Sequence, residues 1–154
     1  MKKLLCVAVL VAVIGAGTAF AQFGIGVHGG GGTLGGGGGI NLAFSDIYIY
    51  VDALGAWDGG MHVSGAVDFL SLYKTNLASN FDFYVRVGVG AGLWGFNDTF
   101  GLAAAARVPV GVSWKPIPLI ELFLQAVPQI GLKILPSIDL FWGVGGNLGV
   151  RFWF

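Results

Sequence analysis

Apolar and polar residues alternate with a period of two along most of this chain. The pattern is clearest over residues 81–93, where Phe81, Val85 and Val89 fall on one face and Asp82 and Arg86 on the other. Successive side chains of a β-strand point to opposite faces, so this period predicts strands whose two faces meet different surroundings. We therefore expect an all-β fold.

The same rule predicts eight antiparallel strands. They cover approximately residues 23–28, 39–44, 47–52, 61–69, 81–94, 102–114, 120–127 and 140–154. Pro128 is expected to weaken the end of the seventh strand, because proline cannot donate a hydrogen bond to a ladder.

The connections between these strands predict an up-and-down order with tight turns on the side of the termini. Ser45-Asp46 and residues 115–118 make two such turns, whereas the link over residues 72–80 is longer than expected there. Residues 29–39 are nearly all glycine, and we expect them to form a mobile loop without a fixed binding surface.

The charged residues of the strands fall on the face opposite the aliphatic row. They are Asp52, Asp68, Asp82, Arg86, Arg107, Glu121 and Arg151. A soluble sandwich would cover its polar face with lysine and glutamate, but here that face is mostly glycine, alanine and tyrosine. The pattern therefore predicts a narrow polar lumen and an apolar outer surface that contacts lipid.

Composition supports a membrane protein without membrane helices. Mean hydropathy is +0.79 and only 10% of residues are charged, which is typical of a membrane protein. After Ala21, however, no stretch offers the roughly 20 apolar residues that a spanning helix needs. A closed β-barrel is the other structure that satisfies its backbone in lipid. We predict one domain over residues 22–154, an eight-stranded antiparallel up-and-down transmembrane β-barrel.

The first residues resemble a cleavable signal peptide. Lys2 and Lys3 precede an apolar run that ends in Ala19-Phe20-Ala21, and cleavage after Ala21 would remove residues 1–21. A retained N-terminal membrane anchor is the alternative. Cys6 is the only cysteine and lies in the removed segment, so we expect no disulfide.

Charge balance argues against a nucleic-acid partner. Without Lys2 and Lys3 the chain has six basic and eight acidic residues, whereas nucleic-acid binding needs clustered lysine and arginine. The same few charges could not coat a secreted lipocalin-like barrel, which is the soluble alternative. No metal motif is present, and we expect no cofactor.

The charges inside the predicted lumen are the first candidate site, because an isolated charge there would be very costly. In one interpretation Arg86, Arg107 and Arg151 pair with Glu121, Asp82 and Asp68 and plug the lumen, since eight strands leave an interior that side chains can fill. In the other they line a gated or solvated path for small solutes. Residues that would complete such a network are Asn41, Gln125 and Asn147.

Aromatic residues form two predicted bands near opposite strand ends, as interfacial girdles would; a ligand-stacking surface is the alternative. One band contains Phe23, Phe44, Phe69, Phe81, Trp114, Phe152 and Phe154. The other contains Trp57, Trp94, Phe96, Phe100 and Trp142.

A catalytic site is not expected. His28 and His62 are the only histidines, and Ser64 and Asp68 share the face of His62. A Ser-His-Asp arrangement is defined by geometry, which strand spacing alone does not establish. No polar groups for lipid chemistry stand on the lipid-facing row, so we predict that the chain is not an enzyme.

The last strand ends in Asn147-Leu148-Gly149-Val150-Arg151-Phe152-Trp153-Phe154. This ending resembles the C-terminal β-signal that the barrel-assembly machinery reads in outer-membrane barrels, carried here by Asn147, Gly149, Phe152 and Phe154. The whole of residues 22–154 resembles the small eight-stranded outer-membrane barrels of the OmpA membrane-domain, OmpX and OmpW types.

The resemblance implies an integral protein of the cell outer membrane, surrounded by outer-membrane lipid. It implies barrel-assembly machinery and periplasmic chaperones as partners during biogenesis. The expected function is a non-enzymatic, structural or surface-exposed barrel with a plugged lumen. A narrow channel for small or apolar solutes and a surface adhesin are the alternatives.

Overall fold

The computed structural model describes residues 22–32, 35–57, 60–96 and 99–154. The predicted signal peptide, residues 1–21, lies outside the described residues. Among the described residues no helix is long and apolar enough to cross a bilayer. The strands are β1 (Phe23–Gly32), β2 (Gly35–Phe44), β3 (Ile47–Trp57), β4 (Gly60–Ala78), β5 (Phe81–Phe96), β6 (Thr99–Arg107), β7 (Val110–Ile117), β8 (Ile120–Leu135) and β9 (Asp139–Trp153).

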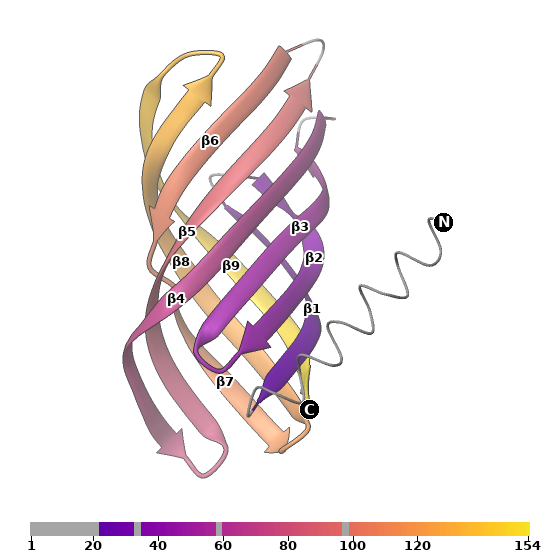
Figure 1. The fold of residues 1–154 in the computed structure, drawn as a ribbon, viewed down its shortest axis with the longest axis vertical. Coiled ribbons are helices and arrows are strands. Elements are labelled where there is room, and N and C mark those ends of the chain that lie inside the picture. The colour runs from indigo at the N-terminus through magenta and orange to yellow at the C-terminus, as the bar shows by residue number, and fades with distance from the viewer. Residues whose placement is uncertain (1–21, 33–34, 58–59, 97–98) are drawn as a thin grey trace.

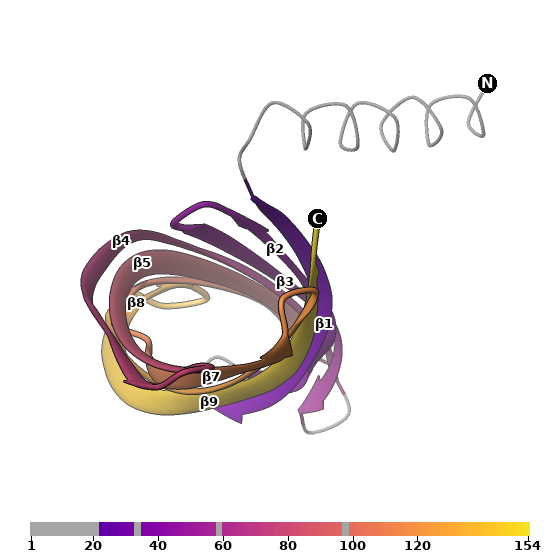
Figure 2. The same ribbon diagram turned by 90° about the horizontal axis from the view of Figure 1, so that it is seen from below.

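The strands form one closed antiparallel ring (Figures 1 and 2). Consecutive strands pair with each other except β6 and β7, and β9 closes the ring by pairing with β1. The strands β6 and β7 share one position, since both pair with β5 on one side and β8 on the other. The ring therefore has eight positions, and the prediction of an all-β, eight-stranded up-and-down barrel is confirmed.

The interruption between β6 and β7 falls at Val108 and Pro109, within the strand expected over residues 102–114. Arg86 N donates to Pro109 O (2.9 Å) and Val108 N donates to Pro128 O (2.9 Å), so the ring stays closed there. The expectation that the seventh strand weakens at Pro128 was wrong, because β8 continues to Leu135. Both prolines meet at this irregularity, where a missing backbone N–H is tolerated.

The glycine-rich segment is a hairpin rather than the mobile loop that was expected. Gly29 pairs with Gly38, Gly30 with Gly37, and the ladder continues to Gly32 and Gly35. Ladder hydrogen bonds use backbone groups alone, and the flanking strands β9 and β3 hold this hairpin on both sides. A run of glycines can therefore form strands here, although it has no side chains to pack.

Two hairpins are longer than the alternation predicted. The expected link over residues 72–80 belongs to β4 and β5, and only Ser79 and Asn80 form the turn. Three bulges interrupt the pairing of β4 with β5. Each bulge adds one residue and so reverses which face the following side chains point to. A strict period of two therefore did not predict this part of the strand. At the other end, β8 and β9 extend to Leu135 and Asp139.

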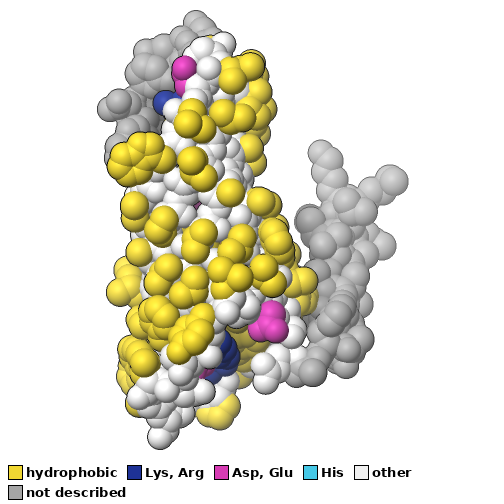
Figure 3. All heavy atoms as spheres, turned by 90° about the vertical axis from the view of Figure 1, so that its left-hand side faces the viewer, with side chains coloured by type: hydrophobic (Ala, Val, Ile, Leu, Met, Phe, Trp, Pro, Cys, Tyr) yellow, Lys and Arg dark blue, Asp and Glu magenta, His cyan; other side chains and the backbone are white. Residues whose placement is uncertain are grey.

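The two faces of the wall differ as predicted from the alternation. Arg86 and Arg151 are only 4% and 1% exposed, whereas Phe152, next to Arg151, is 41% exposed. Figure 3 shows apolar side chains spread over nearly the whole height of one side of the barrel, with few charges among them. The apolar row points outward and the ionic groups are enclosed, which is the arrangement of a barrel that spans a lipid bilayer.

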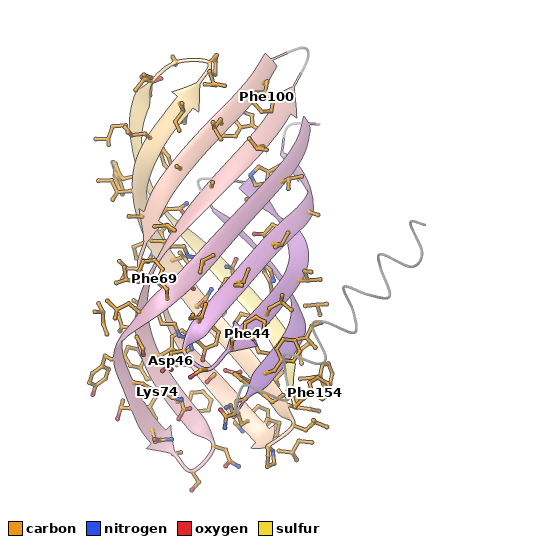
Figure 4. All side chains as sticks on the ribbon, in the orientation of Figure 1. Phe44, Asp46, Phe69, Lys74, Phe100 and Phe154 are labelled. Carbon is orange, nitrogen blue, oxygen red and sulfur yellow. The ribbon has the colours of Figure 1, made fainter. Side chains whose placement is uncertain are left out.

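Most of the aromatic side chains that the structure describes lie toward one end or the other of the barrel. Phe44 and Phe154 lie near the lower end and Phe100 near the upper end (Figure 4). Phe69 lies higher than predicted, because β4 continues to Ala78 beyond it. Trp94 does not join the outer band: it packs inward against the small cluster of Ala103, Ala105 and Phe141. The side chains of Trp57 and Phe96 lie outside the described residues.

Candidate functional site in the barrel lumen

The lower of two ion-paired groups in the lumen is centred on Arg151. Its Nε donates to Asn41 Oδ1 (2.8 Å) and its Nη1 to Glu121 Oε2 (2.9 Å). The indole Nε1 of Trp153 donates to the same Glu121 oxygen (2.7 Å). Arg151, Glu121 and Asn41 are at most 2% exposed, so this charge pair is enclosed and bonded from three strands.

The second ion pair joins Arg107 of β6 to Asp68 of β4. Arg107 Nε lies 3.0 Å from Asp68 Oδ1, and Asp68 is fully buried. The guanidinium also lies 5.2 Å from the centre of the Tyr50 ring. A cation over an aromatic face gains electrostatic attraction, which strengthens when water is excluded.

Arg86 is held by aromatic rings. Its Cζ lies 3.4 Å from the centre of the Tyr48 ring and 3.8 Å from that of Tyr84. Asp82 was expected to pair with one of the three arginines, but its Oδ2 lies 3.5 Å from Lys74 Nζ, near the lower rim. Asp82 stands two pleats below Arg86 on the same face of β5, toward the turn, and the extension of β4 supplies Lys74 at that level.

Tyrosine and phenylalanine side chains connect these groups, and the polarity pattern did not single them out. The ring centres of Tyr50 and Phe123 are 6.3 Å apart, and the Arg151 Cζ lies 4.8 Å from the centre of the Phe123 ring. Tyr84 donates its hydroxyl proton to Gln125 Oε1 (3.1 Å). The signal was their inward parity, which placed these rings on the same face as the charged residues. Together these rings fill the lumen between the two ion pairs.

Inward glycines let polar side chains reach across an intervening strand. Gly88 stands in register between Asp68 and Arg107, which are two strands apart. Three further bonded pairs have the same arrangement: Asn41 and Arg151 across Gly26, His28 and Asp52 across Gly39, and Tyr84 and Gln125 across Gly111. A Cβ at any of these four glycines would overlap a neighbouring strand. The space over these glycines is therefore occupied by the side chains that meet across them, and it is not empty.

We expect Gly88→Ala to destabilise the barrel by about 1–3 kcal/mol, because the new methyl group would overlap the Asp68 carboxylate and the Val67 backbone. Gly65→Ala is the matched control, since its Cβ would meet only Tyr50 O at 3.7 Å. There the substitution should stabilise by roughly 0.5 kcal/mol, as glycine costs conformational entropy in a strand. Urea unfolding in lipid vesicles measures both. Equal effects at the two positions would contradict this role of Gly88.

A small polar cavity lies in the upper lumen. Its volume is about 70 Å³, and its lining includes Asp52, His62, Ser64, Arg107 and Asn147. This exceeds the roughly 10–15 Å³ that one water molecule needs. Glycines of the β1–β2 hairpin and of β9 form part of the cavity wall, where the absence of side chains leaves this space.

The histidines do not form a Ser-His-Asp arrangement. Ser64 Oγ donates to Asp52 Oδ2 (3.0 Å), and His28 Nε2 lies 2.8 Å from Asp52 Oδ1. Asp68 is bound by Arg107 instead, and His62 Nε2 has no hydrogen-bond partner among the described residues. The carboxylate therefore stands between serine and histidine, where it cannot orient a histidine that activates the serine.

The C-terminal residues that resemble an assembly signal have distinct positions. Phe152 and Phe154 point outward and are 41% and 74% exposed, and Phe154 stacks on Phe23 at 6.4 Å. Gly149 faces inward, where a Cβ would approach Phe123 and His28 closely. Asn147 lines the upper cavity. Phe154 N donates to Phe23 O (2.8 Å), so the chain end closes the ring.

Within the part of the chain that the structure describes, no three histidine, cysteine, aspartate or glutamate side chains stand close enough to hold a metal ion.

Comparisons with known proteins give structural likeness only. No family model matches the chain, and no curated protein matches it. The solved structures to which the chain is similar include the following three. Neisserial surface protein A is 14% identical over 86% of this chain and 93% of its own, with a TM-score of 0.44. Ail, the attachment invasion locus protein of Yersinia pestis, is 13% identical over 86% and 97%, with a TM-score of 0.41. A major outer membrane protein from Thermus thermophilus is 12% identical over 87% and 100%, with a TM-score of 0.46. In fold, the chain is similar to small outer-membrane β-barrel proteins.

Proposed function

We propose that this chain is an integral, non-enzymatic outer-membrane β-barrel whose lumen is closed by its own side chains. A signal peptide at residues 1–21 would export it, and the ending with Asn147, Gly149, Phe152 and Phe154 would direct its assembly. In this proposal the barrel is a structural or surface-exposed component of the outer membrane, not a conducting pore.

The closed lumen is supported by the burial of its central side chains. Tyr50, Tyr84, Gln125, Asp68 and Arg151 are each less than 2% exposed. They come from five different strands of the ring, which supports a block that crosses the lumen. An eight-stranded barrel has an interior that side chains can fill. The described cavity of about 70 Å³ lies to one side of this block and does not cross it.

Planar-bilayer recording of refolded protein tests the closed state. We expect no stepwise conductance from the native protein, nor from Arg107→Ala, because the Arg151–Glu121 group still blocks the lumen. A variant with both ion pairs and the rings of Tyr50, Tyr84 and Phe123 replaced by alanine is the positive control and should conduct. Discrete conductance steps from the native protein would overturn the proposal and support a narrow channel for small solutes.

A further inference from the structure

The lower half of β4 has one edge without a strand beside it. The ladder between β3 and β4 ends where Tyr48 pairs with Asp68, but β4 continues to Ala78 and there pairs only with β5. We call residues 69–78 of β4 the free edge. Figure 1 shows the β4–β5 hairpin extending below the turn that joins β2 to β3.

The free edge lies outside the hydrocarbon. Unpaired strand edges do not occur in contact with lipid chains, because their backbone groups would have no hydrogen-bond partner. The hairpin also carries a polar group at its end, where Asp82 contacts both Lys74 and Asn76. Both described chain ends and the tight turns lie at this end (Figure 1), which is the periplasmic end in an outer-membrane barrel.

The free edge exposes more apolar side-chain surface than is usual where a protein meets water. Leu70, Leu72, Tyr73 and Leu77 are between 49% and 60% exposed. Leu70 and Tyr73 share the outer face with Val87 and Val85 of β5, while Ser71 and Lys74 fall on the inner face. An unpaired edge with an apolar row is a template for an added strand.

A second copy of this chain does not fit the free edge. Two barrels in one membrane have the same orientation, so their β4 strands run in the same direction. Identical edges related by a two-fold axis pair antiparallel only if one barrel is inverted. Antiparallel pairing between two copies in one membrane is therefore excluded, which favours a different polypeptide as the occupant.

We propose that the free edge binds an extended segment of a periplasmic protein by strand addition. The added strand is antiparallel to β4, apolar on its outer face and polar on its inner face. It carries an acidic residue opposite Lys74, whose side chain is 52% exposed. The bulges and Lys74 limit pairing with unrelated strands, because both are features that protect natural sheet edges. This proposal is independent of whether the lumen conducts.

Two short synthetic peptides test the proposal on full-length barrel refolded in detergent. Both alternate valine and threonine; one has a central glutamate on the threonine face and the other has lysine there. We expect the glutamate peptide to bind about fivefold more tightly, since opposite charges on facing strands attract and like charges repel. Amide hydrogen exchange should slow within residues 69–78 and remain unchanged in β1 and β9.

Charge reversal provides the matched comparison. Lys74→Glu should reverse the preference between the peptides. If that variant does not refold, Lys74→Gln is used in its place and should abolish the preference. Lys133→Glu, at the opposite end of the barrel, should leave the preference as in the native protein. Absence of binding, protection outside residues 69–78, or an unchanged preference in the Lys74 variants would each overturn the proposal.

Discussion

Replacement of Glu121 by leucine should reduce the free energy of unfolding by about 3–5 kcal/mol, the largest effect that we expect from a single substitution. Arg151 would then stay buried at 1% exposure with its ion-pair partner removed. A buried charge left without its partner is strongly destabilising. Unfolding by urea in lipid vesicles, followed by tryptophan fluorescence, measures the change.

The double variant Glu121→Leu and Arg151→Met separates the unpaired charge from other losses. Trp153 loses its acceptor in both variants, so the difference between them reports the removal of the guanidinium together with its bond to Asn41. Replacing a whole buried pair by apolar residues is often neutral, and we expect the double variant to recover most of the stability. A double variant no more stable than the single one would show that the unpaired charge is not the cause.

Replacement of Leu124 by arginine should cost about 2–4 kcal/mol in lipid vesicles. Leu124 lies inside β8, in the half of the strand nearer Ile120, points outward and is 59% exposed. A charge on the lipid face of a barrel is most costly at the bilayer mid-plane and costs roughly 0–1 kcal/mol near the interfaces. The same urea titration measures it.

Ile138→Arg is the control for the effect of depth. Ile138 is even more exposed, at 77%, but lies in the turn between β8 and β9. We expect little loss of stability there. If the outer surface faced water, arginine would be tolerated equally well at both positions, and two small effects would contradict the membrane-spanning arrangement.

The direction of each side chain could be predicted from the sequence where the strands are regular. Arg86 and Arg151 were placed inward and Phe152 outward by alternation alone, and the structure agrees. The prediction was less accurate at bulges. Each extra residue in β4 reversed the parity, so the strand beyond Phe69 and the position of Lys74 were missed.

The partners of the charged residues could not be predicted in the same way. Asp82 was expected to pair with one of the buried arginines, but it meets Lys74 at the lower rim. Arg107 reaches Asp68 across Gly88 because the stagger of three strands brings them to one level. Alternation gives the face of a residue but not its height relative to a strand further around the ring.

The sequence by itself determined which residues face lipid and which face the lumen, because successive side chains of a strand point in opposite directions regardless of the neighbouring strands. Only the tertiary structure decided which lumen residues meet. That choice depends on the register of every ladder between them, on bulges that shift it, and on the glycines over which the side chains cross.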